Sequence, residues 1–411
     1  MESANKRRIL ILTADYGFGH RAASNAIQAA LQYQYHDQVV TEIVNPIDDK
    51  SAPSFLRKEQ DRYDKRVRET PRLYHLGYEI GDLSVTTSVV ESTLIVMLYD
   101  AVRKILRNFQ PDAIITTYPM YLAPLSSIFT IKQKRIPLLT VVTDMGAVQQ
   151  MWFNPVSDRT LVPTEIVRDL AIKHSIRPET IRITGIPVHP NIALENRSKA
   201  EIRSELGWDV EKITVLVVGS KRVRNLKDTL QALNHSGLPI QMVVVAGGDN
   251  ELFHYLESKT WHIDTHIYNR VDNIPTMMHA SDTIVCKAGG LITSEALACG
   301  LPILFIDVIQ GQETGNAEIV IGNGAGELAE NPLHAQEILY HWFDNDRQLL
   351  HERAQNAARL GNPRSSFDIS ELAWEDAGRG QIVIEKPLLD LQRLKALLNR
   401  FDVPWLEDTR T

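Results

Sequence analysis

Residues 286–302 read CKAGGLITSEALACGLP, and this stretch decides the fold class. Residues 283–286 have the composition of a buried strand, Gly289 and Gly290 form a turn, and a helical pattern follows from about Ile292. Because glycine has no Cβ, the backbone of such a turn can approach an anion closely, and the free N–H groups of the following helix face it. The stretch therefore predicts an α/β protein with a phosphate-binding turn.

Glu295 lies one turn inside the predicted helix. Its carboxylate would repel a diphosphate placed directly on it, but it could accept hydrogen bonds from neutral ribose hydroxyls. The pattern thus predicts phosphate at the turn and a sugar beside Glu295. A plain strand, turn and helix with a solvated glutamate is the alternative that this stretch leaves open.

Composition favours a two-domain globular protein. A chain of 411 residues is long for one core, and 44% hydrophobic and 23% charged residues are ordinary values. The net charge of -7 argues against a nucleic-acid partner, and no apolar run reaches the roughly 18 residues that span a bilayer. A cytoplasmic protein is expected, because the start passes directly into a strand pattern. Cys286 and Cys299 lack metal-ligand spacing and read as buried reduced thiols.

Short β-branched runs alternate with amphipathic helical stretches, a pattern typical of parallel sheets covered by helices on both faces. Strands are predicted at residues 7–14, 38–44, 112–117, 137–143, 159–162, 181–184, 213–218, 241–246, 264–268, 283–286 and 302–306. The proline-containing stretch 185–197 reads as a hinge. We therefore predict two similar Rossmann-like domains facing across a cleft, with a ligand at the carboxyl ends of the strands.

The first half carries a second glycine turn, TADYGFGH at residues 13–20, before a helix predicted to begin near Arg21. It is no dinucleotide fingerprint, because Gly17 and Gly19 are present but the third glycine is missing. The dipole at a helix N-terminus disfavours an imidazolium, so His20 is expected to stay neutral and able to accept a proton. A capping or packing histidine is the alternative.

Asp144 directly follows the strand predicted at residues 137–143, at the same edge of the sheet as His20. A carboxylate there could act as a general base or could orient a neighbouring base. An N-cap role is the alternative. Together, His20 and Asp144 predict proton abstraction from an acceptor hydroxyl opposite a diphosphate site.

These motifs resemble the inverting glycosyltransferases of the GT-B fold, and within them the monogalactosyldiacylglycerol synthases and the processive diacylglycerol glucosyltransferases. The similar segments are LTADYGFGHRAASNAI, PDAIITTYPM, VVTDMGAVQQMWF, ITGIPV, KAGGLITSEALACGLP and GQETGN, within roughly residues 7–360. The peptidoglycan lipid glycosyltransferases share the second-domain pattern but start with a longer glycine-rich loop. The GFGH start and the TD-x-G-x5-WF segment favour the glycerolipid branch.

The resemblance implies an N-terminal lipid-acceptor domain at residues 1–188 and a C-terminal UDP-sugar donor domain at residues 199–365. Residues 366–411 form a tail with an amphipathic helix, which could pack back on the first domain or bind a partner. The implied reaction moves a hexose from UDP-glucose or UDP-galactose to diacylglycerol or glycosyl-diacylglycerol, with inversion. Two alternatives stay open: transfer to another lipid or small acceptor, and a catalytically weak protein that senses a UDP-sugar.

The resemblance also assigns residues. His20 and Asp144 would be the base or base partner. The expected nucleotide-sugar contacts are Gly19, Gly219, Ser220, Arg270, Val271, Gly289, Gly290, Leu291, Thr293, Glu295, Gln312, Glu313 and Asn316. The residues of the glycine turn would contact the diphosphate, and backbone groups near Arg270 and Val271 would contact the uracil. The GQETGN residues would contact the sugar or the α-phosphate. No metal and no cofactor is expected, because the UDP-sugar is a substrate and a helix N-terminus would stabilise the leaving charge.

Two segments depart from the family pattern. Residues 217–226, VVGSKRVRNL, are basic where the family often has several glycines, and these cations could bind phosphate or be solvated. Gln149, Gln150 and Asn154 stand where the plant-like synthases carry histidine and basic residues. Acceptor handling and sugar choice therefore stay open.

A charged stretch at residues 57–72, with seven basic and four acidic side chains, precedes an aromatic-flanked apolar region up to residue 109. Such a region could rest on an anionic membrane surface and admit diacylglycerol. This predicts a cytoplasmic protein that binds peripherally to the inner face of the cell membrane. An ordinary charged helix before a core helix is the alternative.

Overall fold

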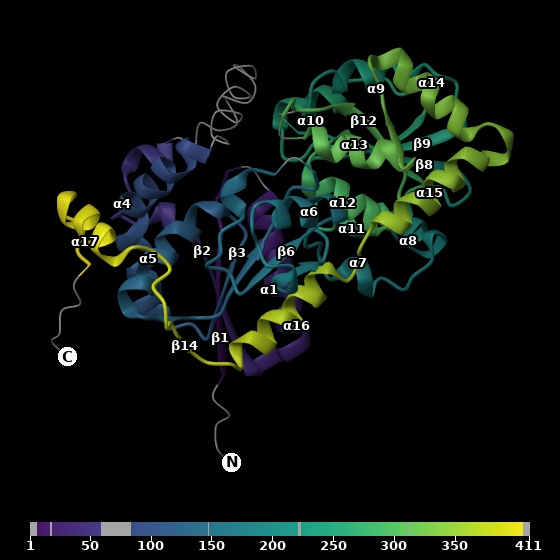
Figure 1. Ribbon diagram of the computed structural model, residues 1–411. Coiled ribbons are helices and arrows are strands. Elements are labelled where there is room, and N and C mark those ends of the chain that lie inside the picture. Colours follow the sequence, from purple (N-terminus) through teal and green to yellow (C-terminus); the bar gives the residue numbers. More distant parts are fainter. Residues whose placement is uncertain are drawn as a thin grey trace. The chain divides into compact units, whose positions relative to one another are not determined.

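The computed structural model describes residues 6–16, 19–58, 84–146, 148–220, 223–311 and 313–405, with the backbone alone for residues 84–88. The chain forms two compact units. Unit 1 contains residues 1–187 and 365–411, and unit 2 contains residues 188–364. Each unit is a parallel sheet with helices on both faces (Figure 1).

The sheet of unit 1 has the strand order β2-β1-β3-β5-β6-β7, and all its neighbouring strands run parallel. Its strands are β1 Arg7–Leu12, β2 Val39–Val44, β3 Ala113–Thr116, β5 Leu138–Val141, β6 Arg159–Val162 and β7 Ile181–Ile183. The chain turns from one side of β1 to the other between β2 and β3. The edge between β1 and β3 is thus a topological switch point, where open α/β sheets bind ligands.

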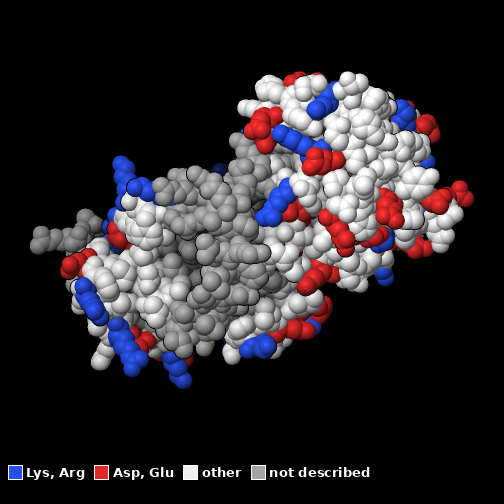
Figure 2. Space-filling model, turned by 90° about the horizontal axis from the view of Figure 1, so that it is seen from above, with Lys and Arg blue, Asp and Glu red and all other residues white. Residues whose placement is uncertain are grey.

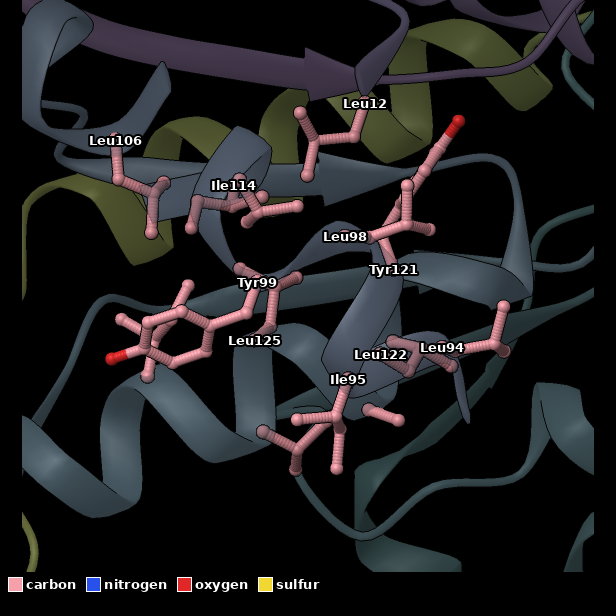
Figure 3. Close-up of a cluster of buried hydrophobic side chains, with 14 of the residues drawn as sticks. Leu12, Leu94, Ile95, Leu98, Tyr99, Leu106, Ile114, Tyr121, Leu122 and Leu125 are labelled. Atoms are coloured by element: carbon pink, nitrogen blue, oxygen red, sulfur yellow. The ribbon is translucent and has the colours of Figure 1, made fainter. Parts of the chain in front are cut away.

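Strand β1 supplies buried clusters on both faces of the unit 1 sheet, because successive side chains of a strand point to opposite faces. Leu10 and Leu12 belong to a buried cluster with helices α4 (Ser84–Phe109) and α5 (Leu122–Lys132), part of which is drawn in Figure 3. Ile9 and Ile11 belong to the cluster on the other face, with α1 (Gly19–Tyr35) and α16 (Ser365–Ala377). Helix α6 of the same unit spans Glu165–Lys173.

The C-terminal segment completes unit 1. Asp376 of α16 is fully buried and accepts two hydrogen bonds from Arg159 at 2.8 and 2.9 Å. Leu394 and Leu398 of α17 (Leu391–Arg400) join the cluster of α4 and α5. The short strand β14 (Ile382–Val383) pairs antiparallel with β4 (Lys134–Arg135). Of the two alternatives for the tail, packing back on the first domain is the one the structure shows.

The sheet of unit 2 has the order β10-β9-β8-β11-β12-β13, which is the strand order of the Rossmann fold. Its strands are β8 Ile213–Val218, β9 Ile240–Val245, β10 Asp264–Tyr268, β11 Thr283–Lys287, β12 Ile303–Asp307 and β13 Gly326–Leu328. Its longer helices are α8 Lys199–Leu206, α9 Leu226–Asn234, α10 Asn250–Glu257, α11 Ile274–Ala280, α12 Gly290–Ala298, α13 Thr314–Gly322, α14 Pro332–Phe343 and α15 Gln348–Leu360; α7 spans Asn191–Leu194 in the hinge stretch. The switch point lies between β8 and β11.

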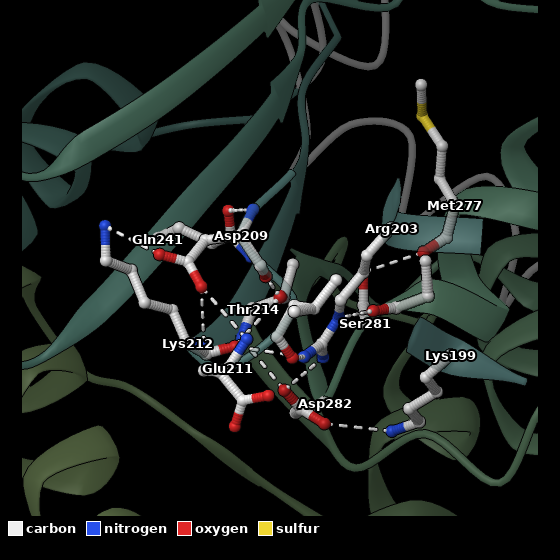
Figure 4. Close-up of polar contacts among 12 residues, drawn as sticks. Lys199, Arg203, Asp209, Glu211, Lys212, Thr214, Gln241, Met277, Ser281 and Asp282 are labelled. Atoms are coloured by element: carbon white, nitrogen blue, oxygen red, sulfur yellow. Dashed lines mark hydrogen bonds and ion pairs between the residues drawn. The ribbon is translucent and has the colours of Figure 1, made fainter. Parts of the chain in front are cut away.

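A polar network closes the amino edge of the unit 2 sheet (Figure 4). The buried guanidinium of Arg203 donates to the Ala280 carbonyl at 2.8 Å and pairs with Asp282 at 2.6 Å. Asp282 also accepts from the Thr214 amide at 2.9 Å and pairs with Lys199 at 2.9 Å. Because a buried charge is tolerated only when paired, this network is part of the scaffold. The opposite, carboxyl edge is left for a ligand.

All eleven predicted strands are present, with ends that differ by up to two residues, and β4, β13 and β14 were not predicted. The two predicted helix starts are wrong by two residues. Helix α1 begins at Gly19 instead of near Arg21, and α12 begins at Gly290 instead of near Ile292. Glycine is unfavourable inside a helix but is tolerated at its start, so the glycines read as turn residues.

Candidate functional site

His20 lies in the first turn of α1, at the switch-point edge of unit 1. Its ring makes an edge-on contact with Tyr118 at 4.9 Å between centroids and lies 6.2 Å from the ring of Trp152. Burial lowers the pKa of His20 from 6.5 to about 4, against a hydrogen bond with the Thr117 backbone that raises it. The lowered pKa favours a neutral ring near pH 7, as the sequence predicted, but its physical cause is burial and not the helix dipole invoked from the sequence.

Thr143, the residue before Asp144, contacts the ring of His20. The Thr143 hydroxyl and the Nδ1 atom of His20 lie 2.9 Å apart. Thr143 is buried and Asp144 is half-buried, directly after β5. The structure thus brings Asp144 to the same edge as His20, as predicted, with Thr143 as the direct partner. The sequence analysis did not predict a role for Thr143.

The turn between β11 and α12 has room for a small side chain at Gly289. Gly289 has an ordinary backbone φ of −69°, and a Cβ built on it would meet only ordinary contacts of 3.6 Å or more. Nothing in the described protein therefore requires glycine there. The hydroxyl of Thr293 is buried in the first turn of α12 and has no hydrogen-bond partner among the described residues. Gly290 and Leu291 are the first two residues of α12.

Glu295 lies one turn further along α12 and is partly exposed. No described residue donates a hydrogen bond to its carboxylate. Burial raises the pKa of Glu295 from 4.5 to about 7. A carboxylate held near its titration point and without a protein donor suits neutral hydroxyl donors better than an anion.

Glu313 and Asn316 of the GQETGN segment make polar contacts within unit 2. Glu313 is buried, pairs with Lys287, and accepts from the Ile309 amide at 3.0 Å. Asn316 is buried and donates to the Ala288 carbonyl at 2.9 Å. These contacts tie the loop after β12 to the turn after β11. Their role toward the sugar or the α-phosphate stays a prediction.

The other predicted contacts also follow strands of the unit 2 sheet or open α1. Gly219 follows β8, where a Cβ would lie 2.7 Å from a methyl group of Leu226 and 2.9 Å from one of Leu252, so both leucine side chains would have to shift. Ser220 is partly exposed beside it. Arg270 is exposed and Val271 partly buried after β10, and Gly19 is the first residue of α1. Gly17, Gln312, Lys221 and Arg222 lie outside the described residues.

Lys287 is the second residue that the sequence reasoning missed. It ends β11 directly before the glycine turn and pairs with Glu313. A cation between a buried strand and a phosphate-binding turn was a signal in the sequence. Across the described part of the chain, no group of three or more histidine, cysteine, aspartate or glutamate side chains is placed to hold a metal ion.

Most of the predicted membrane-contact stretch at residues 57–72 lies outside the described residues. None of the described helices combines the length and the apolar character that crossing a membrane requires. On the face drawn in Figure 2, basic and acidic side chains of the described residues are interspersed. A mixed surface of this kind does not resemble the basic face of a nucleic-acid-binding protein.

Comparisons with known proteins cover both units. Residues 20–188 match the family model of monogalactosyldiacylglycerol (MGDG) synthase, and residues 198–359 match that of glycosyl transferases group 1. The probable chloroplastic monogalactosyldiacylglycerol synthase of Nicotiana tabacum is 32% identical over 390 residues, which span 90% of this chain and 70% of that protein. The corresponding protein of Glycine max is 31% identical over 379 residues, with 90% and 71% covered.

Solved structures of other glycosyltransferases share the fold. MurG of Acinetobacter baumannii superposes with a TM-score of 0.57 at 14% identity, covering 90% of this chain and 99% of that one. SnogD of Streptomyces nogalater superposes with a TM-score of 0.53 at 15% identity, covering 90% and 100%. Two Rossmann-like units with these neighbours make the fold GT-B. With relatives above 30% identity along nine-tenths of its length, the chain belongs to the monogalactosyldiacylglycerol synthase family of glycosyltransferases.

Proposed function

We propose that this protein transfers a hexose from a UDP-sugar to the hydroxyl of diacylglycerol, or of a glycosyl-diacylglycerol, with inversion at the anomeric carbon. Family membership supports the reaction class and the acceptor, since the relatives are monogalactosyldiacylglycerol synthases. The observation that carries the proposal is the half-buried ring of His20, which contacts the Thr143 hydroxyl at the switch-point edge of unit 1 and whose pKa is lowered to about 4. A neutral imidazole is the general base that an attacking hydroxyl needs.

The acceptor oxygen forms a bond to the anomeric carbon as the bond from that carbon to the β-phosphate oxygen breaks. The proton of the hydroxyl passes to His20, and the electron pair of the broken bond leaves with UDP. The low pKa of about 4 makes His20 a weak base in the ground state. Proton transfer becomes favourable as the hydroxyl turns acidic during bond formation, so the base acts in the transition state.

The donor binds at unit 2 in this proposal. The turn at Gly289 and Gly290, the start of α12 and the orphan hydroxyl of Thr293 would receive the diphosphate. Glu295 would accept hydrogen bonds from the ribose. The N–H groups at the start of α12 would stabilise the charge that develops on the leaving UDP, so the reaction proposed here uses no metal and no cofactor.

The site of action proposed here is the inner face of the cell membrane, to which the protein would bind peripherally through anionic lipid. The acceptor supports this proposal, because diacylglycerol resides in the bilayer. Recovery of the protein with vesicles of phosphatidylglycerol, and not with phosphatidylcholine, would test this placement.

Transfer from labelled UDP-glucose or UDP-galactose to diacylglycerol in anionic vesicles tests the function. We expect transfer from one of the two donors, and its loss in His20→Ala. His36→Ala is the matched control, because His36 is exposed and precedes β2 at the amino edge of the same sheet. Binding of UDP without transfer to any acceptor would contradict the proposal and would favour a sensor.

A further inference from the structure

An ion pair between the half-buried Lys287 and the buried Glu313 lies beside the turn between β11 and α12. The side chain of Lys287 is 15% exposed and that of Glu313 is 6% exposed. The second carboxylate oxygen of Glu313 accepts from the Ile309 amide at 3.0 Å. Removing two charges from water is costly, and a buried pair is often no more stable than apolar residues of the same size. The pair therefore suggests a role besides stability.

The backbone of β11 is irregular at Lys287. Cys286 is opposite Phe305 of β12, whereas Lys287 is opposite Asp307, so the register shifts between them. Such bulges change the direction of a side chain and are frequent beside active sites. Here the bulge is at the last residue of a strand that borders the switch point.

The missing side chain of Gly289 opens onto the ion pair. A Cβ built at Gly289 would lie 3.6 Å from Nζ of Lys287 and 3.7 Å from Oε1 of Glu313. The backbone φ of −69° does not require glycine, and a side chain at this position would contact both members of the ion pair. The unpartnered, fully buried hydroxyl of Thr293 lies in the first turn of the same helix. An anion at the turn would thus meet a hydroxyl, backbone N–H groups and an ammonium group.

We propose that Lys287 binds the diphosphate of the donor, and that Glu313 is its counter-charge rather than a phosphate contact. The inference rests on the proposed function, which supplies the UDP-sugar. A lysine carries three N–H donors, so Lys287 can keep Glu313 and still donate to a phosphate oxygen. A carboxylate next to a diphosphate would repel it, and the pairing with Lys287 cancels that repulsion.

Binding of UDP and of uridine to the full-length protein tests this assignment. Lys287→Met should weaken UDP binding by about 10- to 100-fold, the range expected for losing a charged hydrogen bond. Uridine binding should stay unchanged, because uridine has no phosphate. An equal loss for both ligands, or no loss for UDP, would overturn the assignment. If the wild-type protein binds uridine and UDP but transfers no sugar, the proposed function fails and the Lys287 assignment stands on the binding data.

Two further variants separate binding from folding. Lys287→Met alone leaves Glu313 buried without its partner and should lower the midpoint of thermal unfolding. The double variant Lys287→Met with Glu313→Gln removes both charges, so the midpoint should recover while UDP binding stays weak. Glu313→Gln alone keeps the ammonium group and should bind UDP at least as tightly as the wild type. A loss of UDP affinity in Glu313→Gln equal to that in Lys287→Met would show a purely structural pair.

Discussion

Each unit places a titratable side chain in the helix that follows a strand at the switch point, with opposite results. His20 follows β1 in unit 1, and Glu295 follows β11 in unit 2; each strand borders the switch point of its sheet. Burial disfavours charge at both positions. It lowers the pKa of His20 to about 4 and raises that of Glu295 to about 7. The same physical effect thus gives a neutral base in one unit and a hydroxyl acceptor in the other.

The comparison predicts that His20 affects the transfer step and that Glu295 affects UDP binding. His20→Gln should lower transfer by about 100- to 10,000-fold, the usual contribution of a general base, and should leave UDP affinity unchanged. Glu295→Gln should weaken UDP binding and raise the KM for the UDP-sugar. Steady-state kinetics and calorimetric UDP titration of both variants check this.

Glu318→Gln is the matched control, because Glu318 is an exposed carboxylate on α13 of the same unit. It should change neither transfer nor UDP affinity. If His20→Gln and Glu295→Gln lowered UDP affinity to the same degree, the proposed separation between base and nucleotide contact would be wrong.

The glycines sharpen the comparison between ligand site and scaffold within unit 2. Gly247 has a φ of +65°, and a Cβ there would lie 2.4 Å from the Gly219 carbonyl oxygen. Gly247→Ala should therefore lower the free energy of unfolding by about 3 to 5 kcal/mol, measured by urea denaturation. Gly289→Ala has an ordinary φ and no close contact, so it should keep near wild-type stability but bind UDP more weakly. A large loss of stability in Gly289→Ala would make that glycine structural.

His20 should make unit 1 sensitive to acid. Its folded pKa of about 4 is below the ordinary 6.5, so the unfolded chain takes up the proton first as the pH falls. Stability that is present above pH 6.5 is therefore lost as the pH falls toward 4, by at most about 3 kcal/mol. His20→Gln does not titrate, so its urea midpoint should fall less between pH 7.5 and 4.5 than that of the wild type. Parallel losses in the two proteins would show that the ring is not held neutral.

The strands of both units could be predicted because strands buried on both faces read as continuous apolar runs, such as AIIT in β3 and LLTV in β5. The partner of His20 could not be predicted from the sequence. Consecutive residues of an extended segment point to opposite sides, and nothing in the sequence decides whether Thr143 or Asp144 faces the ring. The same holds for Lys287 and Glu313, which lie 26 positions apart and meet only in the folded sheet. The pairing of Arg159 with Asp376, 217 positions apart, likewise joins the C-terminal segment to unit 1.

The smallest expected effect concerns the charge of Glu295. Its raised pKa of about 7 means that the carboxylate is mostly ionised at pH 8 and mostly protonated at pH 6. An ionised carboxylate accepts hydrogen bonds from ribose hydroxyls better than a carboxylic acid does. Uridine affinity should therefore fall by about threefold from pH 8 to pH 6, a change of under 1 kcal/mol. Uridine is the ligand of choice, because a phosphate of UDP titrates in the same range.

Glu295→Gln isolates the charge, since glutamine keeps a carbonyl acceptor of nearly the same shape and does not titrate. Its uridine affinity should be weaker than that of the wild type at pH 8 and should not change between pH 6 and 8. The His20→Gln variant should keep the wild-type pH dependence of uridine affinity. The imidazole that it removes has a pKa of about 4, which is outside the range of pH 6 to 8. A flat profile in the wild type would mean that Glu295 meets no ribose hydroxyl. Of the two titratable side chains compared, only His20 would then keep a functional role.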